Sequence, residues 1–476
     1  MNRYQKANQG IHAPEDLKQK MVQSAKPVRR FPTRWAALAA VLVLAVVAGV
    51  VFWPGGSPLA PAASAAIVQA EYPDRAPYPE PNPFTGMPDE AAFDAWWEEN
   101  RVLNQLPVDN ESMTDYYAAT MAQFLGDNGG ANAVYSPLNL YLALAMLAET
   151  AGGDSQEQIL DLLGADGVEA LRAQAENLWN ANYRDDGHLT SLLANSVWLS
   201  KDLSYNQDTL NTLAECYYAS SYQGEMGSEQ LNRVLQSWLN DNTGGLLKEY
   251  ADGVELSPDT LLALASTIYF KAAWSDEFNQ EATASRTFHG TAGDVTADFM
   301  NQTWDTNYYW ADRFSAVSKS FQDGGEMWLI LPDEGTSPEE LLAESQLIDF
   351  LTAQEWENTK FLEVKLSLPK FDVSAQTDLI GGLKELGVTD VFDPALADFT
   401  PMLGKGVDAY VTQATHAARV RIDEKGCEGV AYTVIEADEA APLEQDEIDF
   451  VLDRPFLFAV TSRTGQLLFV GIVNQV

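Results

Sequence analysis

The stretch whose residue types and spacing are most informative lies at 421–439 and reads R-I-D-E-K-G-C-E-G-V-A-Y-T-V-I-E-A-D-E. A glycine, Gly426, marks a turn, and larger residues then alternate with small ones. Because successive side chains of a strand point to opposite faces, the small residues would form one row. A segment with one small face can enter a crowded sheet as an extra strand. The small row comprises Cys427, Gly429, Ala431 and Thr433.

Catalytic and metal-binding patterns are missing from the sequence. It contains no G-x-S-x-G elbow, no H-E-x-x-H motif and no P-loop, and only four histidines: His12, His188, His289 and His416. The two cysteines, Cys216 and Cys427, show no zinc-type spacing, so we expect free thiols. We therefore predict that the protein is not an enzyme and uses no metal or cofactor.

The charge distribution is uneven along the 476 residues. Residues 1–34 hold 8 Lys and Arg against 2 acids, whereas the whole chain has a formal charge of −40. Nucleic-acid binding needs a basic surface, so the strongly acidic remainder of the chain argues against it. A hydrophobic content of 46% and 12 Trp indicate a well-filled core.

Residues 35–53 form an uncharged apolar run of 19 residues. As a helix this run would be about 28 Å long, close to the thickness of a bilayer's hydrocarbon core. Arg29, Arg30 and Arg34 precede it and would keep residues 1–34 in the cytoplasm. We expect a single-pass anchor with the rest of the chain outside the cell. The alternative is a secreted protein, cleaved after the small residues 63–65.

Residues 54–111 are rich in Pro and Ala and read as an extended extracellular spacer. Within the spacer, residues 91–102 could form a short helix that packs Trp96 or Trp97 on the domain. The globular domain would then cover residues 112–476.

The pattern of this domain is mixed α+β. Ser136 and Pro137 read as the cap and first turn of one helix, and Asp154 reads as the cap of the next. Four later runs, rich in β-branched and aromatic residues, read as strands: residues 194–199, 264–270, 327–332 and 362–369.

Seven ordered motifs resemble one family, the serpins, over residues 112–476. They are N-A-V-Y-S-P-L-N-L at 132–140, A-N-S-V-W-L at 194–199, L-N-R-V-L-Q-S-W-L-N-D-N-T-G-G at 231–245, I-Y-F-K-A-A-W at 268–274, L-P-K-F at 368–371, D-R-P-F-L-F at 453–458 and L-F-V-G at 468–471. With the anchor ahead of it, the chain resembles bacterial membrane-anchored serpins.

The resemblance implies a fold of about nine helices and three β-sheets with an exposed reactive-centre loop. It also implies a suicide-substrate inhibitor of serine, possibly cysteine, endopeptidases, acting as a monomer. The target protease forms an acyl-enzyme with the loop, and the loop then inserts into the main sheet. A non-inhibitory serpin, acting as a surface binding or adhesion module or as a protease substrate, is the alternative.

The resemblance also assigns roles to residues around the loop. The hinge would comprise Glu424, Gly426, Cys427, Gly429, Ala431 and Thr433, with Val430 and Tyr432 facing outward after insertion. Control of sheet opening would fall to Ser136, Asn139, Ser266, His416, Lys370 and Trp274. The family more often has Ser at the second and Asn at the third of these positions, so Asn139 would supply the amide here.

Counting along the loop from Glu424 places the scissile bond between Ala440 and Ala441. A small residue there suits an elastase-like protease. The rival positions are Asp438, which suits an aspartate-specific protease, and Glu439. Trypsin-like targets are disfavoured because the only basic residue between Arg421 and Arg454 is the hinge residue Lys425.

Overall fold

The computed structural model describes residues 66–80, 88–126, 128–187, 189–322, 324–353, 355–427 and 446–476. All of them belong to a compact unit that spans residues 58–476. No helix in these ranges is long and apolar enough to cross a bilayer. The anchor predicted at residues 35–53 lies outside the described residues, as do residues 428–445 of the loop.

The described residues form twelve α-helices, more than the nine or so expected. The excess comes from α4, which precedes the predicted domain, and from three helices of four or five residues, too short to show a helical period in the sequence. The helices are α4 (Glu90–Leu103), α5 (Met113–Leu125), α6 (Pro137–Thr150), α7 (Gly153–Leu163), α8 (Val168–Asn182), α9 (Gln207–Cys216), α10 (Glu229–Asp241), α11 (Lys248–Ala251), α12 (Pro338–Leu342), α13 (Ser345–Thr352), α14 (Leu379–Glu385) and α15 (Thr400–Leu403).

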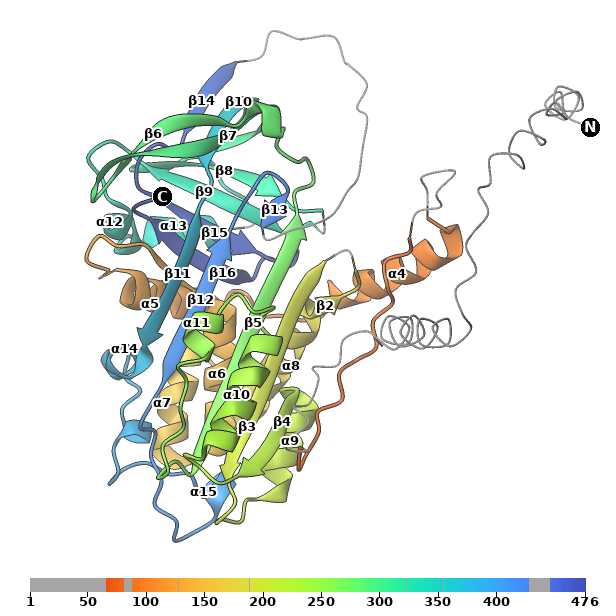
Figure 1. Ribbon diagram of the computed structural model, residues 1–476, viewed down its shortest axis with the longest axis vertical. Helices are drawn as coiled ribbons and strands as arrows, with labels where there is room; N and C mark the ends of the chain where they lie inside the picture. Colours follow the sequence, from red (N-terminus) through yellow and green to blue (C-terminus); the bar gives the residue numbers. More distant parts are fainter. Residues whose placement is uncertain are drawn as a thin grey trace, which may run out of the picture. The chain divides into compact units, whose positions relative to one another are not determined.

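The strands of the described residues form three sheets, as expected, and all four predicted strands are present. The largest sheet has nine strands and lies at the upper end in Figure 1. Its order is β1 (Ala133–Tyr135), β16 (Leu467–Val473), β15 (Phe456–Thr461), β9 (Glu326–Pro332), β8 (Phe314–Ser320), β7 (Gly293–Trp310), β10 (Thr359–Pro369) and β14 (Glu447–Val451), with β6 (Ala284–Gly290) paired to β7.

The other two sheets lie side by side below the first one (Figure 1). One has the order β13 (Gly426–Cys427), β5 (Leu262–Ala273), β3 (Thr190–Ser200) and β2 (Arg184–Asp185), with β4 (Ala219–Gly224) also paired to β3. The second pairs β11 (Asp372–Asp378) with β12 (Thr415–Arg421).

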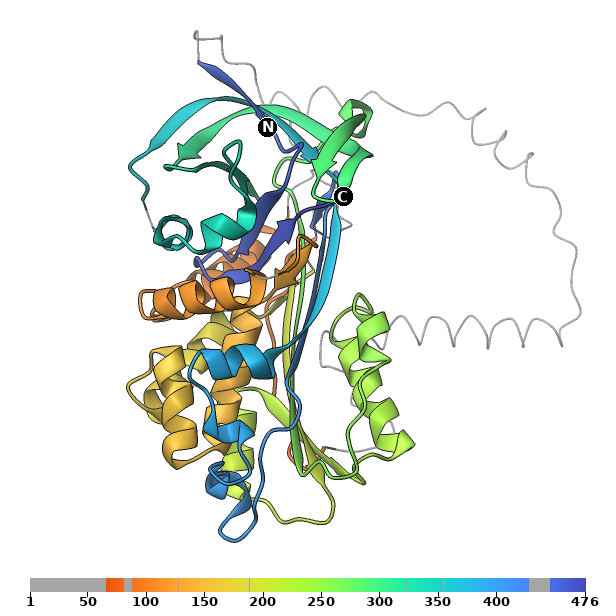
Figure 2. The same ribbon diagram turned by 90° about the vertical axis from the view of Figure 1, so that its left-hand side faces the viewer.

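Helices cover both faces of these lower sheets. Figure 2 shows α10 and the short α11 on one face and α6 with its neighbours on the other. Trp198 and Tyr222 of the sheet pack against Trp238 of α10 in a small apolar cluster. The large core lies on the α6 side and includes Leu193 and Val197 of β3. Because both faces are covered, a strand that joined the sheet would be buried on both sides.

Two helix starts show what local sequence can and cannot predict. Ser136 caps α6 as predicted, and its hydroxyl accepts a hydrogen bond from the Asn139 N–H. The prediction that Asp154 caps the next helix is wrong, because α7 begins two residues earlier than that cap implies, with Gly152 as its cap. A Cβ atom at Gly152 would lie 3.1 Å from the Pro401 ring of α15, so this helix start packs closely against an element distant in the chain.

The predicted spacer is not detached from the domain over its described part. Val68 forms an antiparallel bridge with Ser221 on the edge strand β4. The Ser221 N–H donates to the Val68 carbonyl, and the Ile67 N–H donates to the Ser221 carbonyl, both at 2.8 Å. Further along, α4 forms as predicted. It buries Trp96, whose indole N–H donates to Asp186 at 2.8 Å, and leaves Trp97 45% exposed. The described residues 66–80 and α4 are therefore bound to the domain.

Tyr72 is the central side chain of this N-terminal segment. Its ring lies 5.3 Å from Trp179, 5.5 Å from Tyr183 and 6.1 Å from Tyr218. Its hydroxyl donates to the Tyr218 carbonyl at 3.3 Å. Aromatic pairs at such distances stabilise by about 0.5–1.5 kcal/mol beyond their buried area.

We predict that Tyr72→Ala lowers the free energy of unfolding by about 2 kcal/mol, below the cost of deleting a fully buried aromatic ring because Tyr72 is half-buried. Urea denaturation of the purified chain measures this loss. The neighbouring exposed change Glu71→Ala is the control and should stay within about 0.5 kcal/mol of the wild type. Equal stability of both variants would show that the segment is not part of the folded domain.

Candidate functional site

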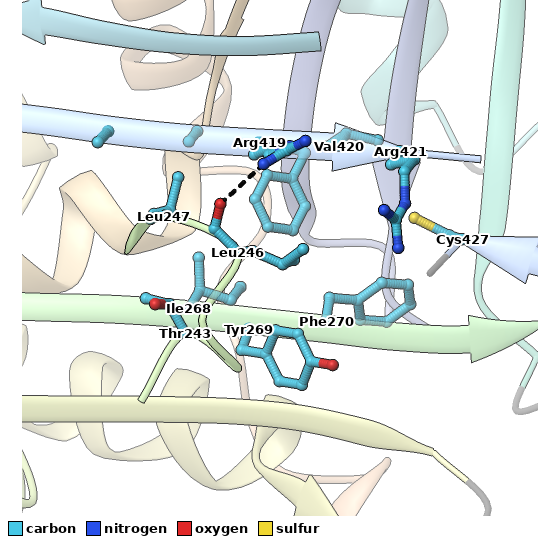
Figure 3. Close-up of a pocket in the computed structure, with 13 residues that line it drawn as sticks. Thr243, Leu246, Leu247, Ile268, Tyr269, Phe270, Arg419, Val420, Arg421 and Cys427 are labelled. Carbon is cyan, nitrogen blue, oxygen red and sulfur yellow. Dashed lines mark hydrogen bonds between the residues drawn. The ribbon is translucent and has the colours of Figure 1, made fainter. Parts of the chain in front are cut away.

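The candidate site is the seam between β5 and β12, where the two lower sheets face each other without a backbone ladder in the described residues. A cavity of about 20 Å³ lies in the seam. Ile268 and Phe270 line it from β5, and Ala418 and Val420 line it from β12 (Figure 3). The facing strand edges can therefore accept hydrogen bonds from one more strand.

A linker after α10 covers the outer side of the seam. Leu246 and Leu247 line the cavity from this linker. Arg419 of β12 donates to the Leu246 carbonyl at 3.0 Å, the bond drawn in Figure 3, and pairs with Asp372 of β11 at 2.6 Å. The linker therefore closes the outer side of the seam between the two sheets.

The hinge occupies the upper end of the seam. Gly426 lies opposite Ala273 and Cys427 opposite Ala272, as an antiparallel extension of β5. Cys427 is buried. A Cβ atom at Gly426 would lie 2.2 Å from the Ala272 carbonyl oxygen, so only glycine fits this close approach. The first two residues of the predicted inserting segment are thus already paired with the sheet.

A tight turn leads the chain from β12 into this position. The Asp423 carboxylate accepts hydrogen bonds from the backbone N–H groups of Lys425, at 2.8 Å, and Gly426, at 3.3 Å. The Asp423 N–H donates to the Gly426 carbonyl at 3.0 Å. This Asx-type turn reverses the chain and aims it down the seam.

The turn that follows β5 holds the hinge from the other side. Trp274 donates its backbone N–H to the Lys425 carbonyl and its indole N–H to the Asp423 carbonyl, both at 2.9 Å. The Phe278 N–H donates to the Glu424 carbonyl at 2.9 Å. These bonds attach the hinge backbone to β5 at three consecutive carbonyls.

An ion pair stands beside this backbone contact. The Lys370 ammonium lies 2.7 Å from the Glu424 carboxylate, which also accepts from the Thr283 hydroxyl at 2.8 Å. The Glu424 side chain is only 8% exposed. Burial by itself would raise the pKa of Glu424, but the hydrogen bonds from Lys370 and Thr283 outweigh it and leave the pKa below its usual value. The pair is therefore partly buried, not a free surface contact.

Lys319, which the sequence analysis did not single out, supports the same turn. Its ammonium lies 4.4 Å from the Phe278 ring centre, 5.6 Å from Trp274 and 5.5 Å from Trp304. It also donates to the Asp276 carbonyl at 2.6 Å, and burial lowers the pKa of this lysine to about 8. The aromatic residues and the lysine of this cluster are spread over 46 residues of the chain. Their spacing therefore gave no indication in the sequence that they would meet.

A second polar group spans the seam lower down. His416 on β12 accepts a hydrogen bond at Nε2 from the Ser136 N–H at 3.0 Å. Ser136 caps α6, and Asn139 on α6 donates to the Ser266 carbonyl of β5 at 3.3 Å and accepts from the Ser266 hydroxyl. The four residues thus connect β12 to β5 through the start of α6.

The buried histidine in this network is neutral. Burial lowers the pKa of His416 from 6.5 to about 4. Acceptance of a hydrogen bond at Nε2 places the single ring proton on Nδ1. Protonation of Nε2 would break the bond to Ser136, so the link across the seam requires the uncharged ring.

The structure brings together nine of the residues assigned by the resemblance. They are Ser136, Asn139, Ser266, His416, Lys370, Trp274, Glu424, Gly426 and Cys427. Gly429, Ala431, Thr433, Asp438, Glu439, Ala440 and Ala441 lie outside the described residues. The contribution of Thr283 and Phe278 to the hinge was missed, because their contacts depend on chain segments about 140 residues away.

The fold and site define a class of protein, an α+β domain in which the two lower sheets are the halves of one divided sheet. We call these two sheets together the main sheet, and the hinge lies at the upper end of the seam between them. Sequence comparison agrees with this class. The profile of the family described as "Serpin (serine protease inhibitor)" matches residues 112–476. Serpin-Z1C of Triticum aestivum is 30% identical over 383 residues, which cover 75% of this chain and 94% of the wheat protein.

Two further relatives extend the comparison. A serpin-like protein of Thermococcus kodakarensis is 27% identical over 409 residues, covering 83% of this chain and 92% of that protein. The crystal structure of tengpin, a thermophilic serpin, in its native state aligns with a TM-score of 0.69 and 23% identity, covering 87% of this chain and all of the tengpin chain. The likeness to tengpin shows the fold.

The chain belongs to the serpin family. Members of this family are generally protease inhibitors rather than enzymes, and they typically bind their target proteases covalently, although some are non-inhibitory.

We predict that Lys370→Ala lowers the free energy of unfolding by about 1–3 kcal/mol at pH 7, because it leaves the buried Glu424 carboxylate without its cation. The folded pKa of Glu424 is below its ordinary value of 4.5, so the ion pair stabilises above that pH and is lost as the pH falls through the folded pKa. Urea denaturation should therefore show that the difference in free energy of unfolding between the wild type and Lys370→Ala becomes smaller in acid. The control is Lys360→Ala, which breaks an exposed pair with Asp446 and should cost less than about 1 kcal/mol.

A second prediction concerns the pH dependence set by His416. Its folded pKa is lower than its unfolded pKa, so the unfolded chain binds more protons between pH 6.5 and about 4. The contribution of His416 to the free energy of unfolding is therefore fully present above pH 6.5. It falls by about 3 kcal/mol in total as the pH drops through this window. His416→Asn should flatten this slope in denaturant titrations. Equal slopes for wild type and His416→Asn would contradict the prediction.

Proposed function

We propose that this serpin is a suicide-substrate inhibitor that inserts residues 428 onward as a new strand between β5 and β12 after a protease attacks its loop. The observation that carries the proposal is the pairing of Gly426 and Cys427 with β5 at the upper end of the seam. A Cβ atom at position 426 would collide with Ala272, so the glycine lets the start of the loop lie against the edge of β5, where the inserted strand would begin.

The register of this pairing supports a definite length for the inserted strand. If it continues down β5, Gly429 meets Phe270, Thr433 meets Ser266, and residue 437 meets Leu262, where β5 begins. Ten residues, 428–437, would then pair with β5 over about 33 Å. Ala440 follows three residues later and stays outside the sheet, as a residue bonded to a protease must. Asp438 also lies beyond residue 437 but by only one residue, so the wider separation of Ala440 from the strand supports Ala440–Ala441 as the proposed bond.

The energy available from such an insertion is sufficient. Each backbone hydrogen bond adds about 1 kcal/mol net, and the new strand would form bonds on both edges. The total is on the order of 10 kcal/mol, comparable with the stability of a whole protease domain. A protease held by an ester at the end of the strand can therefore be deformed before the ester is hydrolysed.

The proposed target is an elastase-like serine protease. Ala440 is small, and Lys425 in the hinge is the only basic residue of the loop segment. Arg454 lies beyond β14, after the loop has returned to the upper sheet. An aspartate-specific protease that cleaves after Asp438 is the rival target.

We also propose that the apolar run at residues 35–53 anchors the inhibitor in the cell membrane with the serpin domain outside. The support comes from its length, its lack of charge and the arginines before it. The first described residue, Ala66, follows the run by about a dozen residues, and the chain is attached to β4 from there. The tether between the membrane and the domain would therefore be short.

We predict that the full-length chain forms a detergent-stable covalent complex with pancreatic elastase on denaturing gels. Thr433→Arg should reduce complex formation at least about tenfold and increase cleaved inhibitor, because a charge on the inward row is costly to bury. The matched control, Glu436→Arg, places the same side chain on the outward row and should retain the complex. Mass spectrometry of the released peptide identifies the scissile bond. Cleavage without a complex in the wild type would reject the inhibitor and leave the substrate or binding module.

A further inference from the structure

A second and larger cavity, of about 340 Å³, lies apart from the seam, between α4 and the upper ends of β2 and β3. Its volume is within the range of small-molecule sites in proteins. Apolar side chains from five parts of the chain form its walls: Tyr78, Phe93, Trp96, Leu189, Phe270 and Leu468. One wall of this cavity, α4, precedes the residues that match the family, so the family resemblance assigns no role to the complete cavity.

Two buried polar atoms in the cavity lining have no hydrogen-bond partner among the residues that the structure describes. They are Asn182 Oδ1 and Ser191 Oγ, on side chains of residues that are 3% and 2% exposed. Asn182 uses its amide hydrogens on the Leu178 carbonyl and on Gln466, which leaves only its oxygen. Unpaired buried polar atoms cost about 1–3 kcal/mol each, and such atoms in a cavity are expected to meet a bound molecule.

The charged groups of the lining are already engaged with the protein. Arg184 donates to Asn100 at 3.0 Å and to the Tyr183 carbonyl at 2.7 Å. Asp186 accepts from Trp96 at 2.8 Å and from the Leu189 N–H at 2.9 Å. Arg463, the third charged residue of the lining, lies 5.5 Å from the centre of the Trp97 ring. Because these three groups are held by the protein, the cavity suits a neutral molecule.

We propose that this cavity binds a small neutral ring compound with hydroxyl groups along one edge, either a sugar residue or a phenol. A hydroxyl can donate to Asn182 Oδ1 and exchange a hydrogen bond with Ser191 Oγ. The other face of the ring would lie against the aromatic walls provided by Phe93 and Trp96. The binding site would therefore join α4 to the main sheet.

The position of Phe270 connects this cavity to the seam. Phe270 lines both cavities, and its cross-strand partner on β3 is Ser191. A molecule bound to Ser191 would thus contact a residue that borders the seam. Binding itself does not depend on protease trapping, so the two proposals can fail independently.

Titration calorimetry of the full-length chain with glucose, galactose and phenol tests the proposal. We expect saturable binding of either the sugars or phenol, with a Kd that rises about tenfold in Ser191→Ala, because that change removes one hydrogen bond and no protein contact. The matched control is Ser221→Ala, because the buried Ser221 hydroxyl also has no partner in the described residues but belongs to β4 and is not part of the cavity lining. Its Kd should equal that of the wild type.

Three results would overturn the proposal. The first is that none of the probes binds the wild-type chain. The second is a Kd that is unchanged in Ser191→Ala, or raised equally by Ser191→Ala and Ser221→Ala. The third is a crystal structure, grown with saturating probe, in which only water contacts Asn182 and Ser191. Elastase trapping would be unaffected by any of these outcomes.

Discussion

The facing edges of β5 and β12 impose the constraint on which the rest of this structure depends. Backbone N–H and C=O groups along two strand edges have no ladder between them in the described residues, although helices and a linker cover both faces. Closing the edges onto each other, or filling them with a new strand, would lower the free energy. The surrounding contacts therefore have to keep the two edges apart, and in the mechanism we propose they do so until the loop enters the seam.

Those contacts lie at three separate positions along the length of the seam. At the top, the hinge backbone is bound to the turn after β5, and the Lys370–Glu424 pair fixes its side. In the middle, Arg419 holds the covering linker. Lower down, neutral His416 connects β12 to α6, which in turn is bound to β5 through Asn139. Each contact is modest, so an entering strand with ten or so new backbone pairs can displace them in succession.

The N-terminal segment adds a second layer of organisation to this serpin. Within residues 66–80, Val68 bridges to the edge strand β4 and Tyr72 packs against α8. The helix α4 then lies over the upper ends of β2 and β3. The sequence predicted α4 but assigned the segment to a spacer. Its attachment could not be predicted, because the partners Ser221, Trp179 and Asp186 are distant in the chain and carry no motif of their own.

The sequence by itself determined the family, the strands, the capped start of α6, the turn glycine of the hinge and the row of small residues after it. These features depend on local periodicity or on ordered motifs, which survive without knowledge of the fold. Only the tertiary structure decided that the sheet is divided at β5 and β12, that Thr283, Phe278 and Lys319 support the hinge, and that two polar atoms line a cavity under α4. The physical reason is that hydrogen bonds and packing between distant segments are chosen by the three-dimensional arrangement of many elements at once, and no spacing along the chain records that choice.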